Sequence, residues 1–227
     1  MTGVQTCALP ISQVPLRLQL WVQPSERAET RRRLERLGLA HHLRVAIHPG
    51  GHFFRGKRWS TEGFAQVADA LVERYDARVV LVGGEDDVEP AHEIETCARH
   101  PLVNLTGALN LRQTAALLEA CHLFIGNDSG PMHIAEAVGT PVVAIFGPTN
   151  PANFRPLLEK SRVVRRDLCG PCIHWLEAAN LYLHVFRNPD CTFDCIRQVT
   201  AADVLAAADA LLAENPSRRE ATAIKGS

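Results

Sequence analysis

Short apolar runs alternate with helical patterns along most of this 227-residue chain. The runs are rich in Val, Ile and Leu, which predicts strands. Behind Ser60, between the first two runs, apolar residues recur at helical spacing and predict a helix. Such alternation is typical of an α/β fold, here a Rossmann-like doubly wound parallel sheet. The predicted strands are 44–48, 78–84, 102–107, 122–127, 141–147 and 161–166.

Several predicted helices have recognisable ends. Asn110 and Gln113 form a capping pattern ahead of one helix, and Thr200 and Asp203 form one ahead of the last helix. Gly139 closes another, because glycine readily takes the left-handed conformation found at helix ends. The predicted helices span 60–75, 89–100, 111–121, 131–139 and 200–214.

The chain divides into four segments. Residues 1–14 lack the features of a signal peptide and are similar to translated sequencing-adapter read-through, so we expect them to be non-native or disordered. Residues 15–43 carry a charged helical pattern, which predicts a connector helix or a solvated face. Residues 44–213 form the predicted Rossmann-like domain, and residues 214–227 are expected to be a disordered tail.

The overall charge excludes some partners. The formal net charge is -1, which gives no general attraction to nucleic acid, so we expect no nucleic-acid partner. The sequence has no run of the roughly 18 to 20 apolar residues that a membrane-spanning helix needs. Anion binding must therefore come from local groups of Lys and Arg.

The stretch HPGGHFFRGKRWS, residues 48–60, is one residue short of a P-loop. A P-loop places Ser or Thr after its lysine as a magnesium ligand, but Arg58 stands there and offers only hydrogen-bond donors. The helical pattern also begins further along, so Lys57 lies on the incoming loop. We therefore predict a metal-free phosphate loop built on the Gly50 and Gly51 amides, with a plain surface turn as the alternative.

A second candidate anion site follows the strand at 122–127. Asp128 ends this strand, Ser129 is the predicted N-cap of the next helix, and His133 lies within its first turn. Amides at Ser129 and Gly130 predict binding of a diphosphate. The alternative is an ordinary cap followed by a helix-terminal histidine.

Taken together, HPGG…GKRWS…F and NDSGPMH.AEA.GTP.VA.FGPT resemble the carboxyl-terminal, donor-binding half of glycosyltransferase family 9, the bacterial lipopolysaccharide heptosyltransferases. The resemblance covers residues 15–212. It implies half of a GT-B fold, in which two Rossmann-like domains face a cleft, and inverting transfer that requires no metal cofactor. It also implies an ADP-heptose donor, a lipid A or lipopolysaccharide core acceptor, and a cytoplasmic location peripheral to the inner membrane.

The resemblance also implies a set of donor-binding residues. The diphosphate is expected near the glycines and Lys57, the sugar and phosphates near the second motif, and the ribose near a carboxylate, Asp87 or Glu89. The alternative interpretation is that these two acids are solvated charges of a surface loop. The full set is His48, Gly50, Gly51, Lys57, Arg58, Asp87, Glu89, Asp128, Ser129, Gly130, His133, Pro148 and Thr149.

Four cysteines have the spacing of a zinc site, namely Cys169, Cys172, Cys191 and Cys195. Similar clusters occur at this place in many members of the family. A structural zinc, free or redox-labile thiols, and disulfides all stay open as interpretations, although a cytoplasmic enzyme disfavours stable disulfides.

Two rival functions use the same nucleotide-binding features. One is another GT-B-type enzyme with a different sugar nucleotide, and the other is a non-catalytic nucleotide-sugar-binding module. The family places its acceptor site and its catalytic Asp, the general base, in an amino-terminal domain that this chain almost entirely lacks. We therefore expect no catalytic residue in this chain.

The purified chain should bind a donor and transfer little or no sugar, because it supplies no base to activate the acceptor hydroxyl. A transfer assay with ADP-heptose and a lipopolysaccharide core acceptor measures this. Steady product formation by the chain alone would contradict the expectation.

Overall fold

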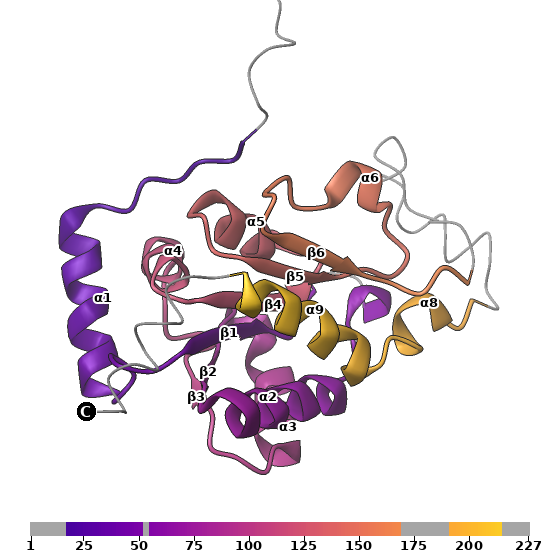
Figure 1. Cartoon of the computed structure of the whole chain (residues 1–227), viewed down its shortest axis with the longest axis horizontal. Coiled ribbons are helices and arrows are strands. Elements are labelled where there is room, and N and C mark those ends of the chain that lie inside the picture. The colour runs from indigo at the N-terminus through magenta and orange to yellow at the C-terminus, as the bar shows by residue number, and fades with distance from the viewer. Residues whose placement is uncertain (1–16, 52–54, 169–190, 215–227) are drawn as a thin grey trace, which may run out of the picture.

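The computed structural model describes residues 17–51, 55–168 and 191–214. Six parallel strands form one sheet in the order β3-β2-β1-β4-β5-β6 (Figure 1). This order is typical of dinucleotide-binding Rossmann folds and confirms the predicted doubly wound sheet. The strands are β1 (Arg44–His48), β2 (Arg78–Leu81), β3 (Val103–Asn104), β4 (Leu123–Asn127), β5 (Val142–Ile145) and β6 (Ser161–Val164).

Helices cover both faces of the sheet (Figure 1). One hydrophobic cluster joins the sheet to α2, α3 and α9, and the other joins it to α1, α4 and α5. The helices are α1 (Pro24–Arg36), α2 (Thr61–Tyr75), α3 (Val88–Cys97), α4 (Leu111–Glu119), α5 (Gly130–Ala137), α6 (Pro151–Phe154), α8 (Asp194–Arg197) and α9 (Ala201–Ala213), with short 3-10 turns η2 (Arg55–Lys57) and η3 (Glu85–Asp87).

The central strands are apolar because both of their faces are covered. Val45 and Ile47 of β1 face the first cluster, while Ala46 faces the second. Val45 pairs with Val79 on one side and with Leu123 on the other. Side chains of successive residues point to opposite faces of a strand, so a strand between two helical layers needs apolar residues throughout.

Two helices begin at the capping residues that the sequence predicted. The Ser60 hydroxyl accepts from the Gly63 amide at 3.0 Å, and the Asn110 side chain accepts from the Gln113 amide at 2.9 Å. Asp76, with φ of 50°, ends α2. The predicted strand 102–107 is shorter than expected, since Gly107 turns the chain with φ of 70°.

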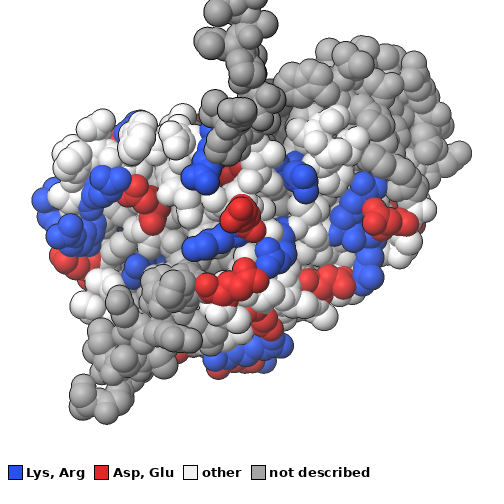
Figure 2. Space-filling model, turned by 45° about the horizontal axis from the view of Figure 1, so that its top comes forward, with Lys and Arg blue, Asp and Glu red and all other residues white. Residues whose placement is uncertain are grey.

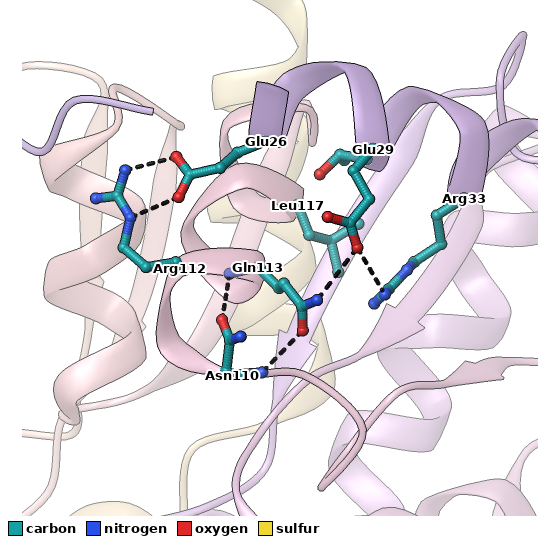
Figure 3. Close-up of a pocket in the computed structure, with 8 residues that line it drawn as sticks. Glu26, Glu29, Arg33, Asn110, Arg112, Gln113 and Leu117 are labelled. Carbon is teal, nitrogen blue, oxygen red and sulfur yellow. Dashed lines mark hydrogen bonds and ion pairs between the residues drawn. The ribbon is translucent and has the colours of Figure 1, made fainter. Parts of the chain in front are cut away.

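The charged helix α1 packs against α4 through ion pairs (Figure 3). Arg112 of α4 donates from Nε to Glu26 Oε1 at 2.8 Å, and Gln113 Nε2 donates to Glu29 Oε1 at 3.2 Å. Leu34, on the inner side of α1, is buried. The connector predicted over 15–43 therefore includes a helix docked on the domain, and its Glu and Arg residues point toward α4 as well as toward solvent.

Surface charge is mixed on the face drawn in Figure 2, where Lys and Arg are interspersed with Asp and Glu. No broad field of one sign covers this face. Within 17–51, 55–168 and 191–214, no helix is long and apolar enough to cross a membrane.

At the amino edge of the sheet, Arg44 and His122 are held together. The Arg44 amide donates to His122 Nδ1 at 3.0 Å, and Arg44 Nη1 donates to the carbonyls of Leu39, Ala40 and His42. Burial, with the Arg44 charge, lowers the pKa of His122 from 6.5 to about 4. A neutral imidazole is therefore part of the folded state.

The free energy of unfolding should fall by about 2–3 kcal/mol as the pH is lowered from about 6.5 to about 4, because only the unfolded chain protonates His122 in that range. His122→Asn keeps an acceptor for the Arg44 amide without titrating, so it should lose less stability. Urea denaturation at several pH values measures this, with exposed His41→Asn as the control. Parallel pH profiles for His122→Asn and the native chain would contradict the prediction.

Candidate functional site

A hollow of about 550 Å³ lies at the carboxyl edge of the sheet. It borders the ends of β1 and β4, the neighbouring strands at which the strand order reverses. Loops diverge at such a switch point, and ligands of open α/β sheets bind there. The described residues that line the hollow are His48, Lys57, Gly84, Glu85, Asp86, Asp87, Asp128, Ser129, Gly130 and Pro131.

Lys57 and Asp128 form an ion pair beside this hollow. Lys57 Nζ lies 2.9 Å from Asp128 Oδ2, and the Asp128 side chain is only 7% exposed. The ammonium also lies 5.9 Å from the centroid of the Phe154 ring, within the range of a cation–π interaction. The Lys57 side chain is 22% exposed, so its charge is available to an anion that enters the hollow.

Asn127, at the end of β4, fixes the loop between β1 and α2 that carries Lys57. Its Nδ2 donates to the carbonyls of Pro49 and Gly50 at 2.9 and 3.0 Å, and its Oδ1 accepts from the Trp59 amide at 3.1 Å. Trp59 is buried and donates from Nε1 to Val199 O at 2.8 Å. Sequence reasoning missed Asn127, although a polar residue at the end of an apolar strand was the available signal.

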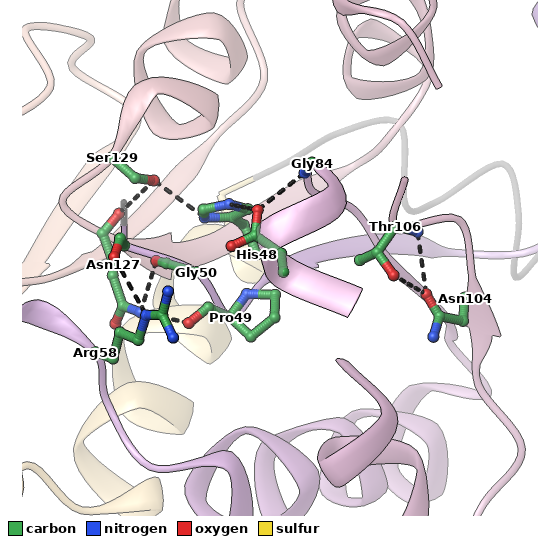
Figure 4. A network of polar contacts seen from close by, with 11 residues as sticks. His48, Pro49, Gly50, Arg58, Gly84, Asn104, Thr106, Asn127 and Ser129 are labelled. Carbon is green, nitrogen blue, oxygen red and sulfur yellow. Dashed lines mark hydrogen bonds and ion pairs between the residues drawn. The ribbon is translucent and has the colours of Figure 1, made fainter. Parts of the chain in front are cut away.

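His48 is buried and links Asp87 to Ser129, and its contact with Ser129 is drawn in Figure 4. Its Nε2 lies 3.2 Å from Asp87 Oδ2, and its Nδ1 lies 3.1 Å from Ser129 Oγ. The Gly84 amide donates to Asp87 Oδ2 at 2.9 Å. Burial opposes ionisation of Asp87, but His48, the Gly84 amide and the Arg58 charge together keep the pKa of Asp87 below its ordinary value.

Two glycines leave room for the Asp87 carboxyl group. A Cβ atom on Gly50 would lie 1.8 Å from Asp87 Oδ1, and one on Gly83 would lie 2.6 Å from Asp87 Oδ2. The first glycine follows β1 and the second follows β2. Asp87 can therefore reach His48 only because both loops lack side chains at these positions.

The fold brings six of the predicted site residues to the hollow, namely His48, Lys57, Asp87, Asp128, Ser129 and Gly130. Gly50 packs against the Asp87 carboxyl group, and the Gly51 carbonyl accepts from Arg58 Nε at 3.2 Å. Ser129 precedes α5 as predicted, but its hydroxyl makes no capping hydrogen bond and instead donates to Asn127 O at 3.0 Å.

The other predicted residues lie elsewhere. Glu89 is exposed on α3, while Pro148 and Thr149 are buried after β5. His133 Nδ1 lies 3.4 Å from Glu136 Oε2 within α5. None of these four is among the described residues that line the hollow.

Glu85 and Asp86 are the carboxylates that sequence reasoning overlooked. All three consecutive acids line the hollow, but Glu85 and Asp86 are exposed whereas the predicted Asp87 is buried. The three acids are consecutive, so the sequence alone gave no reason to choose among them. Their different positions follow from η3, the 3-10 turn that points successive side chains in different directions.

The zinc prediction is untested by the geometry. Cys169 and Cys172 lie outside the described residues. Of the other two cysteines, Cys195 is buried and Cys191 is partly exposed. Among the residues that the structure describes, no group of three or more His, Cys, Asp or Glu side chains is arranged to hold a metal ion.

The hollow thus combines one lysine, the amino end of α5 and several carboxylates. Amides at a helix N-terminus and a neighbouring ammonium bind phosphate groups, and carboxylates accept hydrogen bonds from sugar hydroxyls. The sheet order is the one found in dinucleotide-binding Rossmann folds, and these groups lie where sheets of this kind bind their ligands.

The comparison with protein families is more specific. The model of glycosyltransferase family 9 (heptosyltransferase) matches residues 8–183, and the chain belongs to this family. This confirms the family that the two sequence motifs indicated.

The relatives extend well beyond this chain. Lipooligosaccharide heptosyltransferase 2 of Haemophilus influenzae is 35% identical over 156 residues, which are 66% of this chain and 45% of the relative. Lipopolysaccharide heptosyltransferase 3 of Escherichia coli K12 is 34% identical over 193 residues, 82% of this chain and 51% of the relative. The chain thus spans about half the length of these curated relatives.

Two solved structures share the fold. The ADP-heptose lipopolysaccharide heptosyltransferase II of E. coli superposes with a TM-score of 0.71 at 29% identity, over 89% of this chain and 55% of that chain. A family 9 glycosyltransferase of Veillonella parvula gives a TM-score of 0.76 at 26% identity, over 87% of this chain and 54% of that chain.

Gly50→Ala should destabilise the protein by about 1–3 kcal/mol, since the added methyl group displaces the Asp87 carboxyl group from His48. Gly84→Ala is the matched control, because a Cβ atom there meets nothing within 4 Å. Thermal and urea denaturation of both variants measure the difference. Equal stability of the two variants would show that the contact between Gly50 and Asp87 is not tight.

Proposed function

We propose that this chain is the donor-binding domain of a heptosyltransferase-like glycosyltransferase. The observation that carries the proposal is the Lys57–Asp128 ion pair at the amino end of α5, at the sheet's switch point. Family membership, with relatives named as heptosyltransferases, supports sugar transfer as the reaction. The proposed donor is ADP-heptose or a related sugar nucleotide.

The diphosphate of the donor is proposed to bind between Lys57 and the amino end of α5. Asp128 neutralises Lys57 in this structure. When a diphosphate enters the hollow, Lys57 therefore exchanges one anionic partner for another. This exchange leaves Asp128 near the sugar, where a carboxylate can accept hydrogen bonds from hydroxyl groups. Lys57 and the amides supply the charge that stabilises the leaving nucleoside diphosphate, which suits transfer without a metal ion.

The nucleoside is proposed to lie over the end of β2. In Rossmann folds an acidic residue beyond the second strand binds ribose hydroxyl groups. Exposed Glu85 and Asp86 occupy this place, and they fit the role better than buried Asp87 or than Glu89, which lies on α3. The sugar hydroxyls and the ribose would thus be read by different carboxylates.

Transfer also needs a general base and an acceptor site. The chain spans about half of its curated relatives, and we propose that both functions lie in a part of the protein beyond this chain. The proposed acceptor is a lipopolysaccharide core, reached in the cytoplasm at the inner membrane face. Inversion at the anomeric carbon follows from a single displacement by the acceptor hydroxyl.

Calorimetric titration tests the donor site. ADP-heptose and ADP should bind without magnesium, and more tightly than UDP. Lys57→Ala should weaken ADP binding at least about tenfold, since a charged hydrogen bond to phosphate is lost. Lys160→Ala removes an exposed lysine that does not line the hollow and serves as the matched control.

Equal losses in the Lys57 and Lys160 variants would refute the proposed phosphate site. Tight UDP binding with no ADP binding would favour a related sugar-nucleotide enzyme. Binding only of ATP with magnesium would contradict the metal-free site.

A further inference from the structure

We propose that Asp128 makes this site discriminate between a sugar nucleotide and the free nucleoside diphosphate. It does so by exchanging its ion pair with Lys57 for hydrogen bonds from the donor sugar. Free ADP breaks the same ion pair without offering a replacement, so it is bound less tightly and released. The inference rests on the proposed function and deepens it, because it concerns the same lysine and the same diphosphate.

The Asp128 carboxylate depends on Lys57 in this structure. Lys57 Nζ donates to Asp128 Oδ2 at 2.9 Å, and among the described residues no other group forms a hydrogen bond or ion pair with this side chain. The carboxylate is only 7% exposed, so water replaces little of what the lysine supplies. Because a buried charge that loses its partner is strongly destabilising, Asp128 opposes the loss of Lys57.

An anion at the amino end of α5 competes with Asp128 for the same ammonium. Asp128 directly precedes Ser129, so the amides proposed to bind the diphosphate begin next to its carboxylate. Lys57 is the only lysine or arginine among the described residues that line the hollow, and the Phe154 ring centroid lies 5.9 Å from its ammonium. Like charges in such proximity repel each other, so a diphosphate that takes the ammonium separates Lys57 from Asp128.

The backbone holds Asp128 in place, so a shift of the residue does not relieve this repulsion. Its amide donates to Ile145 O at 3.2 Å, and the preceding Asn127 is fully buried with three hydrogen bonds from its side chain. The Lys57 side chain is flexible in kind and 22% exposed. The lysine therefore changes partners while the carboxylate stays where it is.

A sugar nucleotide offers Asp128 a new partner, and ADP does not. Sugar hydroxyls donate hydrogen bonds to a carboxylate, and bonds to a charged acceptor are stronger than bonds to a neutral one. ADP ends at its terminal phosphate, so the buried carboxylate stays unpaired beside a further negative charge. Attraction to Lys57 alone would favour ADP, whose terminal phosphate has more negative charge than the diester of a donor. Lys57 by itself therefore does not select the donor.

The same exchange favours release of the nucleotide after transfer. Once the sugar has passed to the acceptor, its hydroxyls no longer reach Asp128. Lys57 is then drawn back to the carboxylate, which it contacts at 2.9 Å in the ligand-free structure, and ADP loses its cation. The ion pair is thus the state to which the site returns after each transfer.

Calorimetric titration of Asp128→Asn with ADP and with ADP-heptose tests the exchange. The substitution nearly keeps the shape of the side chain and removes its charge, so ADP should bind about tenfold more tightly than to the native chain. ADP-heptose should not gain, since its hydrogen bonds to a carboxylate are lost together with the charge. Unchanged ADP affinity would mean that Asp128 contacts only the sugar, and reduced ADP affinity would mean that it orients Lys57. Either result would overturn the proposal.

Further variants separate the exchange from general charge repulsion and from misfolding. In a chain that already carries Lys57→Ala, the gain from Asp128→Asn should be several-fold smaller, because no ion pair is left to break. Asp86→Asn removes a negative charge from the same hollow, and its ratio of ADP to ADP-heptose affinity should stay within about twofold of native. Asp128→Ser is a second uncharged variant in which the ADP gain should recur, with thermal denaturation to check that each variant is folded.

The two proposals fail in different ways. If neither ADP nor ADP-heptose binds the native chain, the proposed function fails and this inference fails with it. If both bind but the Asp128→Asn gain is absent, or persists in full without Lys57, the donor site stands and the exchange is overturned. An equal change of the affinity ratio in Asp86→Asn and Asp128→Asn would also overturn it, since any acid in the hollow would then have the same effect.

Discussion

The buried side chain of Asn127 is the interaction on which the site depends. From the end of β4, its amide holds both ends of the loop between β1 and α2, so segments 68 to 78 residues apart in sequence share one rigid reference point. An unpaired amide would be costly at this depth, and full pairing makes its position unique. Lys57 lies two residues before Trp59, which is why its ammonium meets Asp128, the residue next to Asn127.

The hollow is lined by two kinds of polar residue, some partly solvated and some buried. Lys57, Glu85 and Asp86 face the open hollow, and their charges are partly solvated. His48 and Asp87 are buried, and each satisfies the other through a hydrogen bond that two glycine loops make possible. The buried pair anchors η3, the turn that carries Glu85 and Asp86, to the end of β1.

Much of the fold was predictable because it depends on local pattern. Ser60, Asn110 and Thr200 cap helices as predicted, since a cap needs only the residues that follow it within one turn. All six predicted strands occur, although 102–107 shrank to β3 because Gly107 turns the chain. The family was also predictable, since the two motifs are specific and the family model confirms them.

The sequence by itself determined the alternation of strands and helices, the loops that carry the site, and the chain's membership of family 9. Tertiary structure alone decided which of three consecutive acids is buried, that Asn127 holds the loop between β1 and α2, and that His48 meets both Asp87 and Ser129. The physical reason is separation along the chain. These contacts join residues 39 and 81 positions apart, and only the order of strands in the sheet brings them together.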